Sequence, residues 1–70
     1  MLKYLIVIEK TENNYSAYSP DLPGCVATGR SLTEVRQAMQ EAITLHIQGL
    51  QEDCLPVPEP RASADYVAVA

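Results

Sequence analysis

The stretch YSAYSPDLPGCVATG, residues 15–29, decides the fold, because it places a proline-stiffened corner between two runs with strand character. In YSAYS, residues 15–19, the side chains alternate so that Tyr15 and Tyr18 fall on opposite faces of a half-buried strand. Two prolines restrict the chain that follows, and Gly24 permits a positive φ before CVATG, residues 25–29. We therefore predict two strands joined by a rigid corner.

The run LKYLIVIEK, residues 2–10, precedes this pair and is apolar on both of its faces. Tyr4, Ile6 and Ile8 would lie on one side of a strand, and Leu5 and Val7 on the other. Such a two-sided run is typical of an interior strand. The polar turn TENN, residues 11–14, would connect it to the next strand.

From Ser31 onward the hydrophobic period changes from two residues to three or four, which predicts an amphipathic helix lying on the sheet. Ser31 and Glu34 fit the capping box that marks a helix start, and we expect the helix to end near Asp53. The apolar side of this helix would carry Leu32, Val35, Met39, Ala42, Ile43, His46 and Leu50.

The segment after the helix contains LPVPEP, residues 55–60, which three prolines keep extended. DYVAVA, residues 65–70, alternates again and predicts a final strand. The predicted fold is α+β: a single domain, residues 1–70, with a small antiparallel or mixed sheet, one helix on one face and the order β-β-β-α-β. Because one helix covers only one sheet face, the two-sided first strand favours a homodimer or homotetramer.

Composition narrows the possible partners. The formal charge is −4, and the five basic residues lie far apart, so direct nucleic-acid binding is disfavoured and a basic protein partner is allowed. The apolar run YLIVI, residues 4–8, is far too short to span a bilayer, and two cysteines form no dense disulfide pattern. We expect a cytoplasmic protein without a membrane segment.

The reactive side chains of the sequence also fit structural roles. Cys25 after the corner and His46 on the helix suggest a nucleophile and a base, but a small buried thiol and a core or interface histidine explain them better. Cys25, His46 and Cys54 lack paired metal-ligand spacing. Glu9, Glu41 and Asp65 fit solvated charges better than a two-metal nuclease site. We therefore predict no catalytic residue, no cofactor and no metal site.

The segment YSAYSPDLPGCVATGRSLTEVRQAMQEAI, residues 15–43, resembles the signature of the HicB antitoxin family. The resemblance rests on the tyrosine strand, the sequence PDLPGC, and a glycine before a capped helix at fixed spacing. It implies a partial ribonuclease-H-like fold that keeps the sheet and the helix but lacks the metal-binding carboxylates. Many members of the family continue into a DNA-binding module. Because this chain ends at Ala70, we expect no direct nucleic-acid binding by it.

The resemblance also implies an interaction module that binds a HicA-type toxin, a small basic RNA-cleaving protein, and blocks its active site or its RNA-binding surface. A solitary assembly or regulatory module without a toxin is the main alternative, and a small enzyme using Cys25 or the carboxylates is the third. By position and rigidity, we predict that the corner contacts the partner through Tyr18, Pro20, Asp21, Leu22, Pro23 and Cys25.

Overall fold

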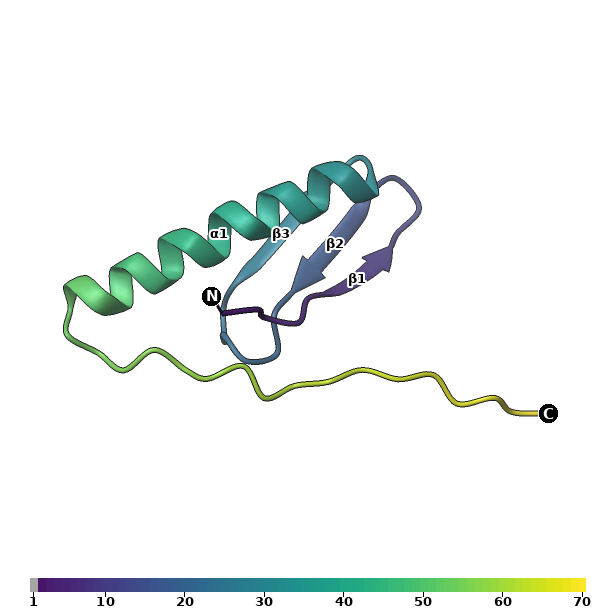
Figure 1. Cartoon of the computed structure of the whole chain (residues 1–70). Coiled ribbons are helices and arrows are strands. Elements are labelled where there is room, and N and C mark those ends of the chain that lie inside the picture. Colours follow the sequence, from purple (N-terminus) through teal and green to yellow (C-terminus); the bar gives the residue numbers. More distant parts are fainter. Residues whose placement is uncertain (1) are drawn as a thin grey trace.

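Three short strands and one long helix form the fold of residues 2–70, the part of the chain that the computed structural model describes (Figure 1). The strands are β1 (Val7–Lys10), β2 (Tyr15–Tyr18) and β3 (Val26–Gly29), and the helix is α1 (Leu32–Glu52). The strands pair antiparallel in the order β1-β2-β3, and α1 packs across β3 and β2. The predicted α+β class is confirmed, with the element order β-β-β-α.

The register of the sheet separates its two faces. Ile8, Ala17 and Ala27 lie opposite one another on the three strands and belong to the side that α1 covers. In the next row Val7, Tyr18 and Val26 lie opposite one another and point to the uncovered side, because successive strand side chains alternate. Tyr15 packs against the core whereas Tyr18 is 43% exposed, so the prediction that they occupy opposite faces is confirmed.

The hydrophobic core lies between α1, the covered face of the sheet and the corner after β2. Its buried members are Ala17, Leu22, Cys25, Val35 and Met39. Leu22 from the corner and Val35 and Met39 from α1 have no exposed surface, so the corner closes one end of the core. Partly buried side chains surround this cluster: Tyr4, Ile6, Ile8, Tyr15, Ala27, Ala42 and Ile43.

The start of α1 is held against the sheet by its cap and by a glycine. The Ser31 hydroxyl accepts a hydrogen bond from the Glu34 N–H at 3.1 Å, and the Glu34 carboxylate accepts one from the Arg30 N–H at 2.8 Å. At Gly29 a Cβ atom would lie 2.6 Å from the Val35 nitrogen, so only glycine allows the last residue of β3 to meet the first turn of α1. Helix α1 ends at Glu52 with Asp53 as its C-cap, as predicted.

Two predictions about the sheet are wrong. Residues 65–70 form no strand; they are extended and solvent-exposed, with Tyr66, Val67 and Val69 at 99%, 83% and 89% exposure. As a consequence β1 is an edge strand of the described sheet and not an interior one, and it begins at Val7 instead of residue 2. Alternation along a strand reports the character of its faces, but it does not specify which neighbour supplies the hydrogen bonds.

The segment after α1, residues 55–70, which we call the tail, runs back beneath the helix and then leaves the domain (Figure 1). The Tyr4 hydroxyl donates a hydrogen bond to the Pro58 carbonyl, and the Ala62 N–H donates to the Asp21 carboxylate. The radius of gyration is 13.6 Å, whereas a globule of this length would have about 11 Å. The projecting end of the tail accounts for this excess.

Candidate partner-binding surface

The corner between β2 and β3 is held by its own backbone. The Ser19 N–H donates to the Cys25 carbonyl at 3.2 Å, and the Cys25 N–H donates to the Leu22 carbonyl at 3.1 Å. Gly24 takes a φ of 82°, in the region that favours glycine, and allows the chain to turn into β3. These bonds explain why a loop with two prolines has one shape and can present a fixed surface.

The six corner residues predicted to contact a partner divide into two groups. Tyr18, Pro20 and Pro23 are exposed, whereas Leu22 and Cys25 are buried in the core at 0% and 5% exposure. Leu22 and Cys25 therefore shape the corner from inside and offer no free side chain in this conformation. The partner contact through the corner stays a prediction, and its exposed members are the ones that can make it.

Asp21 is half-buried and already has a partner within the chain. Both of its carboxylate oxygens lie 3.2 Å from the nitrogen of Ala62, which belongs to the tail. Asp21 therefore links the corner to the tail.

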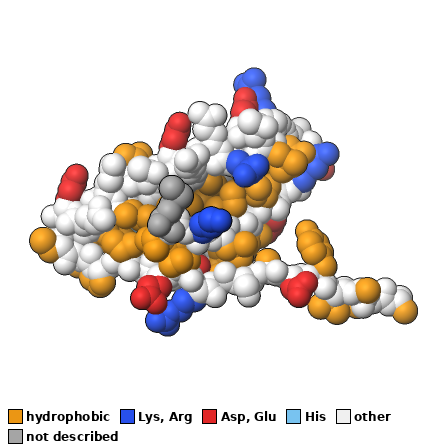
Figure 2. All heavy atoms as spheres, in the orientation of Figure 1, with side chains coloured by type: hydrophobic (Ala, Val, Ile, Leu, Met, Phe, Trp, Pro, Cys, Tyr) orange, Lys and Arg blue, Asp and Glu red, His pale blue; other side chains and the backbone are white. Residues whose placement is uncertain are grey.

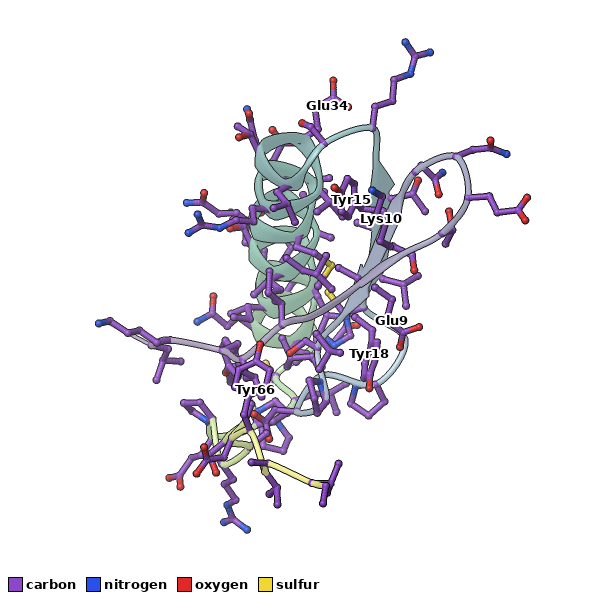
Figure 3. All side chains as sticks on the ribbon, turned by 90° about the vertical axis from the view of Figure 1, so that its right-hand side faces the viewer. Glu9, Lys10, Tyr15, Tyr18, Glu34 and Tyr66 are labelled. Carbon is purple, nitrogen blue, oxygen red and sulfur yellow. The ribbon has the colours of Figure 1, made fainter. Side chains whose placement is uncertain are left out.

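The uncovered face of the sheet adds an apolar row beside the corner. Tyr18 is flanked by Val7 on β1 and by Val26 on β3, and Val26 is 65% exposed. The next row is polar and contains Glu9, Ser16 and Thr28. Figure 3 shows Glu9 directed away from α1 and Tyr15 lying between α1 and the sheet. The uncovered face thus presents an aromatic side chain between two valines, with a carboxylate nearby, which is a composition common in protein interfaces.

The reactive side chains of the corner and the helix differ in their burial. Burial raises the pKa of the Cys25 thiol, so the thiol stays protonated and is a weak nucleophile. His46 is half-buried on α1, and Cys54 is an exposed free thiol after the helix. Cys25 thus has the small apolar role expected of it.

The carboxylates likewise remain separate. Within residues 2–70, no three His, Cys, Asp or Glu side chains come close enough to share a metal ion. Glu9 and Glu41 are exposed, and the Asp65 carboxylate accepts a hydrogen bond at 2.7 Å from the N–H of its neighbour Tyr66. These positions fit charges that interact with solvent and with local backbone.

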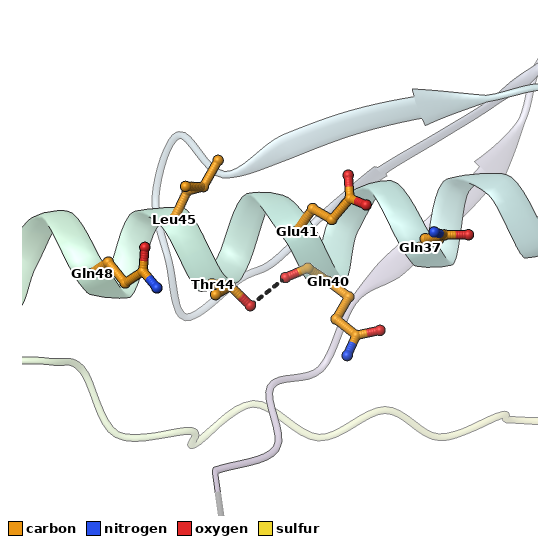
Figure 4. A pocket seen from close by; sticks show the side chains of 6 residues that line it. All are labelled: Gln37, Gln40, Glu41, Thr44, Leu45 and Gln48. Carbon is orange, nitrogen blue, oxygen red and sulfur yellow. Dashed lines mark hydrogen bonds between the residues drawn. The ribbon is translucent and has the colours of Figure 1, made fainter.

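A hollow of about 550 Å³ lies on the outer side of α1, away from the sheet (Figure 4). Amide side chains and Thr44 line most of it, and the Thr44 hydroxyl donates to the Gln40 carbonyl at 2.8 Å. Its wall includes one carboxylate, Glu41, and one apolar side chain, Leu45. No thiol, imidazole or basic side chain is among its lining residues, so it has the character of a solvated helix face.

Two residues that contribute to the corner and the uncovered sheet face, Ser19 and Val26, were not predicted from the sequence. Ser19 is buried at 3% exposure, and its hydroxyl donates to the Leu5 carbonyl at 3.0 Å, which holds the segment before β1 to the corner. Val26 was not singled out, although its position opposite Tyr18 follows once the register is known. The alternation of residues along β2 indicates that Tyr18 faces the uncovered side. Which residue of β3 lies opposite Tyr18 depends on the register, which the length of the corner sets.

Among the helices of residues 2–70, none combines the length and the hydropathy that crossing a bilayer requires. The geometry thus defines a small α+β domain with a rigid corner and an uncovered sheet face.

Comparison with known proteins identifies the family. Residues 4–69 match the HicB-like antitoxin of bacterial toxin–antitoxin systems. This match covers almost the whole chain, and the chain therefore belongs to the HicB-like antitoxin family, as its signature indicated.

Individual relatives agree with this assignment. The chain is 38% identical over 64 residues to an uncharacterised 14.9 kDa protein of Haemophilus phage HP1, an alignment that covers 91% of this chain and 48% of the relative. It is 47% identical over 47 residues to a UPF0150 protein of Helicobacter pylori, covering 67% of this chain and 65% of that protein. The chain thus spans about half of the phage relative and somewhat under two thirds of the Helicobacter protein.

A solved structure has the same fold. A chain of the HicA3 and HicB3 toxin–antitoxin complex superposes with a TM-score of 0.72 and 32% identity, over 86% of this chain and 70% of that chain.

Proposed function

We propose that this chain is a protein-binding antitoxin that neutralises a small basic RNA-cleaving toxin of the HicA type by covering its active site or its RNA-binding surface. The observation that carries the proposal is the structural similarity, at 32% identity, to a chain of a solved toxin–antitoxin complex. The family match over residues 4–69 supports it. Inhibition by occlusion requires binding and no turnover.

The charge of the chain favours a basic partner. Its formal net charge is −4, and complementary charge accelerates the encounter of two proteins and limits wrong pairings. A toxin that binds RNA needs positive charge on its RNA-binding surface. An acidic antitoxin would compete directly with RNA for that surface. We place this inhibition in the cytoplasm.

The uncovered sheet face and the adjoining corner supply the proposed contact. Tyr18 lies at their junction, between Val7 and Val26, with Pro20 and Pro23 exposed beside it. Tyrosine with rigid apolar neighbours is a frequent energetic centre of interfaces because it buries much area and loses little rotamer entropy. Glu9 on the next row would meet a toxin cation at the rim.

RNA cleavage by a purified HicA-type toxin, titrated with this chain, tests the proposal. We expect inhibition to be complete at a fixed stoichiometry, and a Tyr18→Ala plus Val26→Ser variant to need at least about thirtyfold more protein. Leu45→Ser on the outer face of α1, where Leu45 is 67% exposed, is the matched control and should inhibit as the wild type does.

Two results would contradict the proposal. A chain that leaves cleavage unchanged at large excess is not a cover for such a toxin, and the solitary regulatory module then becomes the better reading. Equal loss of inhibition in the Tyr18 variant and in the Leu45 control would remove the uncovered face from the contact.

A further inference from the structure

The Asp21 side chain stands on a backbone that two successive turns hold in place. The Leu22 N–H donates to the Ser19 carbonyl at 3.2 Å and closes the first turn, and the Cys25 N–H donates to the Leu22 carbonyl at 3.1 Å and closes the second. Leu22, which belongs to both turns, has no exposed surface. The main chain of Asp21 is therefore fixed relative to the core, and only its side-chain torsions are free to change.

The Asp21 carboxylate accepts fewer hydrogen bonds than it can. An ionised carboxylate offers about four lone-pair positions and can take both N–H bonds of one guanidinium fork. Here both oxygens share one neutral donor, the Ala62 N–H, at 3.2 Å each. The side chain is only half-buried, so a donor from outside the chain can reach it. The carboxylate thus keeps capacity for a stronger, charged partner.

The tail is held to the domain by little else. Beyond Leu55, and within residues 2–70, it makes two hydrogen bonds to the domain: the Tyr4 hydroxyl donates to the Pro58 carbonyl, and the Ala62 N–H donates to Asp21. Figure 2 shows the tail lying along one side of the body before its end projects free. Loss of the Ala62 bond would leave the tail attached only at Pro58.

Asp21 lies within the surface that the proposed function assigns to the toxin. Exposed Pro20 precedes it directly, and Tyr18, which is 43% exposed, stands three positions earlier. The RNA-binding surface of a toxin carries cations. A cation that reaches the corner would meet the carboxylate beside apolar groups, where exclusion of water strengthens a charge-assisted hydrogen bond.

We propose that Asp21 is the acceptor for an arginine of the toxin, and that the guanidinium displaces the Ala62 N–H from the carboxylate. Both oxygens face the tail at equal distance, so a donor that engages both of them must take the place of Ala62. A guanidinium matches this pair of oxygens better than an ammonium does, because its N–H groups form a planar fork. The tail is therefore an internal competitor of the toxin.

The competition is reciprocal. Bound toxin weakens the attachment of the tail by the same factor by which the attached tail weakens toxin binding. The state of the tail then depends on whether the corner is occupied. This inference rests on the proposed function, since the toxin supplies the arginine.

Calorimetric titration of the chain with a purified HicA-type toxin tests the competition. Ala62→Pro removes the competing N–H and leaves Asp21 unchanged, so the toxin should bind about fivefold more tightly. The control, Ala64→Pro, makes the same change at an exposed position further along the tail and should bind as the wild type does. Asp21→Asn keeps an oxygen for Ala62 but loses the charge, and it should bind about tenfold more weakly.

Nuclear magnetic relaxation reports the tail directly. The order parameter of the Ala62 amide should fall when the toxin saturates the chain, whereas that of the Leu22 amide should keep the value of a rigid backbone. A link that only supports the corner predicts the opposite, namely weaker binding by Ala62→Pro and no release of Ala62.

Unchanged or weaker toxin binding by Ala62→Pro would overturn the inference, as would an Ala62 amide that stays ordered in the complex. Asp21→Asn that binds as the wild type does would also overturn it. If the wild type binds and inhibits the toxin while Ala62→Pro has no effect, only this inference fails. If the wild type does not bind the toxin, the proposed function fails with it.

Discussion

The corner at residues 19–25 and the tail at residues 55–70 are both proline-rich segments without regular structure. The corner forms part of the core, whereas the tail makes few contacts with it. The corner contains Leu22 with no exposed surface and Ser19 and Cys25 nearly buried. The tail has Tyr66, Val67 and Val69 almost fully exposed. Proline stiffness is common to both, so it does not explain the difference.

The difference comes from what each segment can bury and bond within the chain. The corner is short, closes between two paired strands and sends Leu22 beneath α1, where apolar burial and three backbone hydrogen bonds act together. The tail reaches the domain through only a few contacts, at Tyr4 and Asp21. A segment is ordered by the contacts it makes more than by its own restricted dihedrals.

The largest effect that would sharpen this comparison comes from truncating the corner's buried side chain. Leu22→Ala should lower the free energy of unfolding by about 2–5 kcal/mol, because it leaves a cavity beside Val35 and Met39. Leu55→Ala in the tail, where the leucine is 52% exposed, should change it by only about 0.5 kcal/mol. Urea denaturation at one protein concentration measures both, and similar values would show that the tail shares in the core.

A glycine pair extends the test to the junction of sheet and helix. Gly29→Ala should destabilise the fold by about 1–3 kcal/mol, because its Cβ would lie 2.6 Å from the Val35 nitrogen and 2.9 Å from its Cα. Gly49→Ala is the control: apart from its chain neighbours and the backbone of its own helix, no atom lies within 4 Å of the added Cβ, and removal of a helical glycine should stabilise α1 by about 1 kcal/mol. Thermal unfolding separates the two, and a neutral Gly29→Ala would contradict the close approach.

Loss of the hydrogen bond between the corner and the tail should affect amide exchange only near that bond. Asp21→Ala removes the acceptor of the Ala62 N–H, which costs about 1 kcal/mol at that site. We expect the Ala62 amide to exchange with solvent about fivefold faster, without a comparable change in the Leu22 amide. Glu59→Ala, which removes an exposed acid from the same tail, should leave the exchange unchanged. Unaltered exchange in Asp21→Ala would mean that the link does not hold the tail.

The smallest effect concerns the two thiols, one in the corner and one just before the tail. Cys54 is exposed and should react with a thiol reagent in the native state, whereas buried Cys25 should react only on unfolding. A titration of thiols per chain before and after denaturation checks this. Two fast thiols in the native protein would show that the corner opens.

The burial of Cys25 also determines whether the stability of the fold rises or falls with pH. The pKa of Cys25 is raised in the folded state, so folding is favoured while the thiol is protonated, and that contribution is lost as pH rises past 9.0 toward the folded pKa. Relative to Cys25→Ala, the wild type should lose stability above that pH, whereas Cys54→Ala should track the wild type. Parallel curves for wild type and Cys25→Ala would refute this coupling.

Several features of the structure could be predicted from the residues themselves. The capping pair Ser31 and Glu34, the three-to-four period through Ile43 and the opposite faces of Tyr15 and Tyr18 are local patterns, and each is confirmed. The prediction for residues 65–70 was wrong because alternation describes a strand that has a neighbour, and within residues 2–70 no strand pairs with that segment. For the same reason the position of β1 at an edge could not be read from its composition.

The sequence by itself determined the helix, its cap, the turns and the faces of the strands, because these depend on dihedral preferences and on residues within about four positions of one another. Only the tertiary structure decided that Leu22 turns inward while Val26 faces outward, and that Asp21 accepts a hydrogen bond from Ala62, forty-one positions away. These outcomes depend on register and on contacts between distant segments, whose free energies arise when the chain closes around its core.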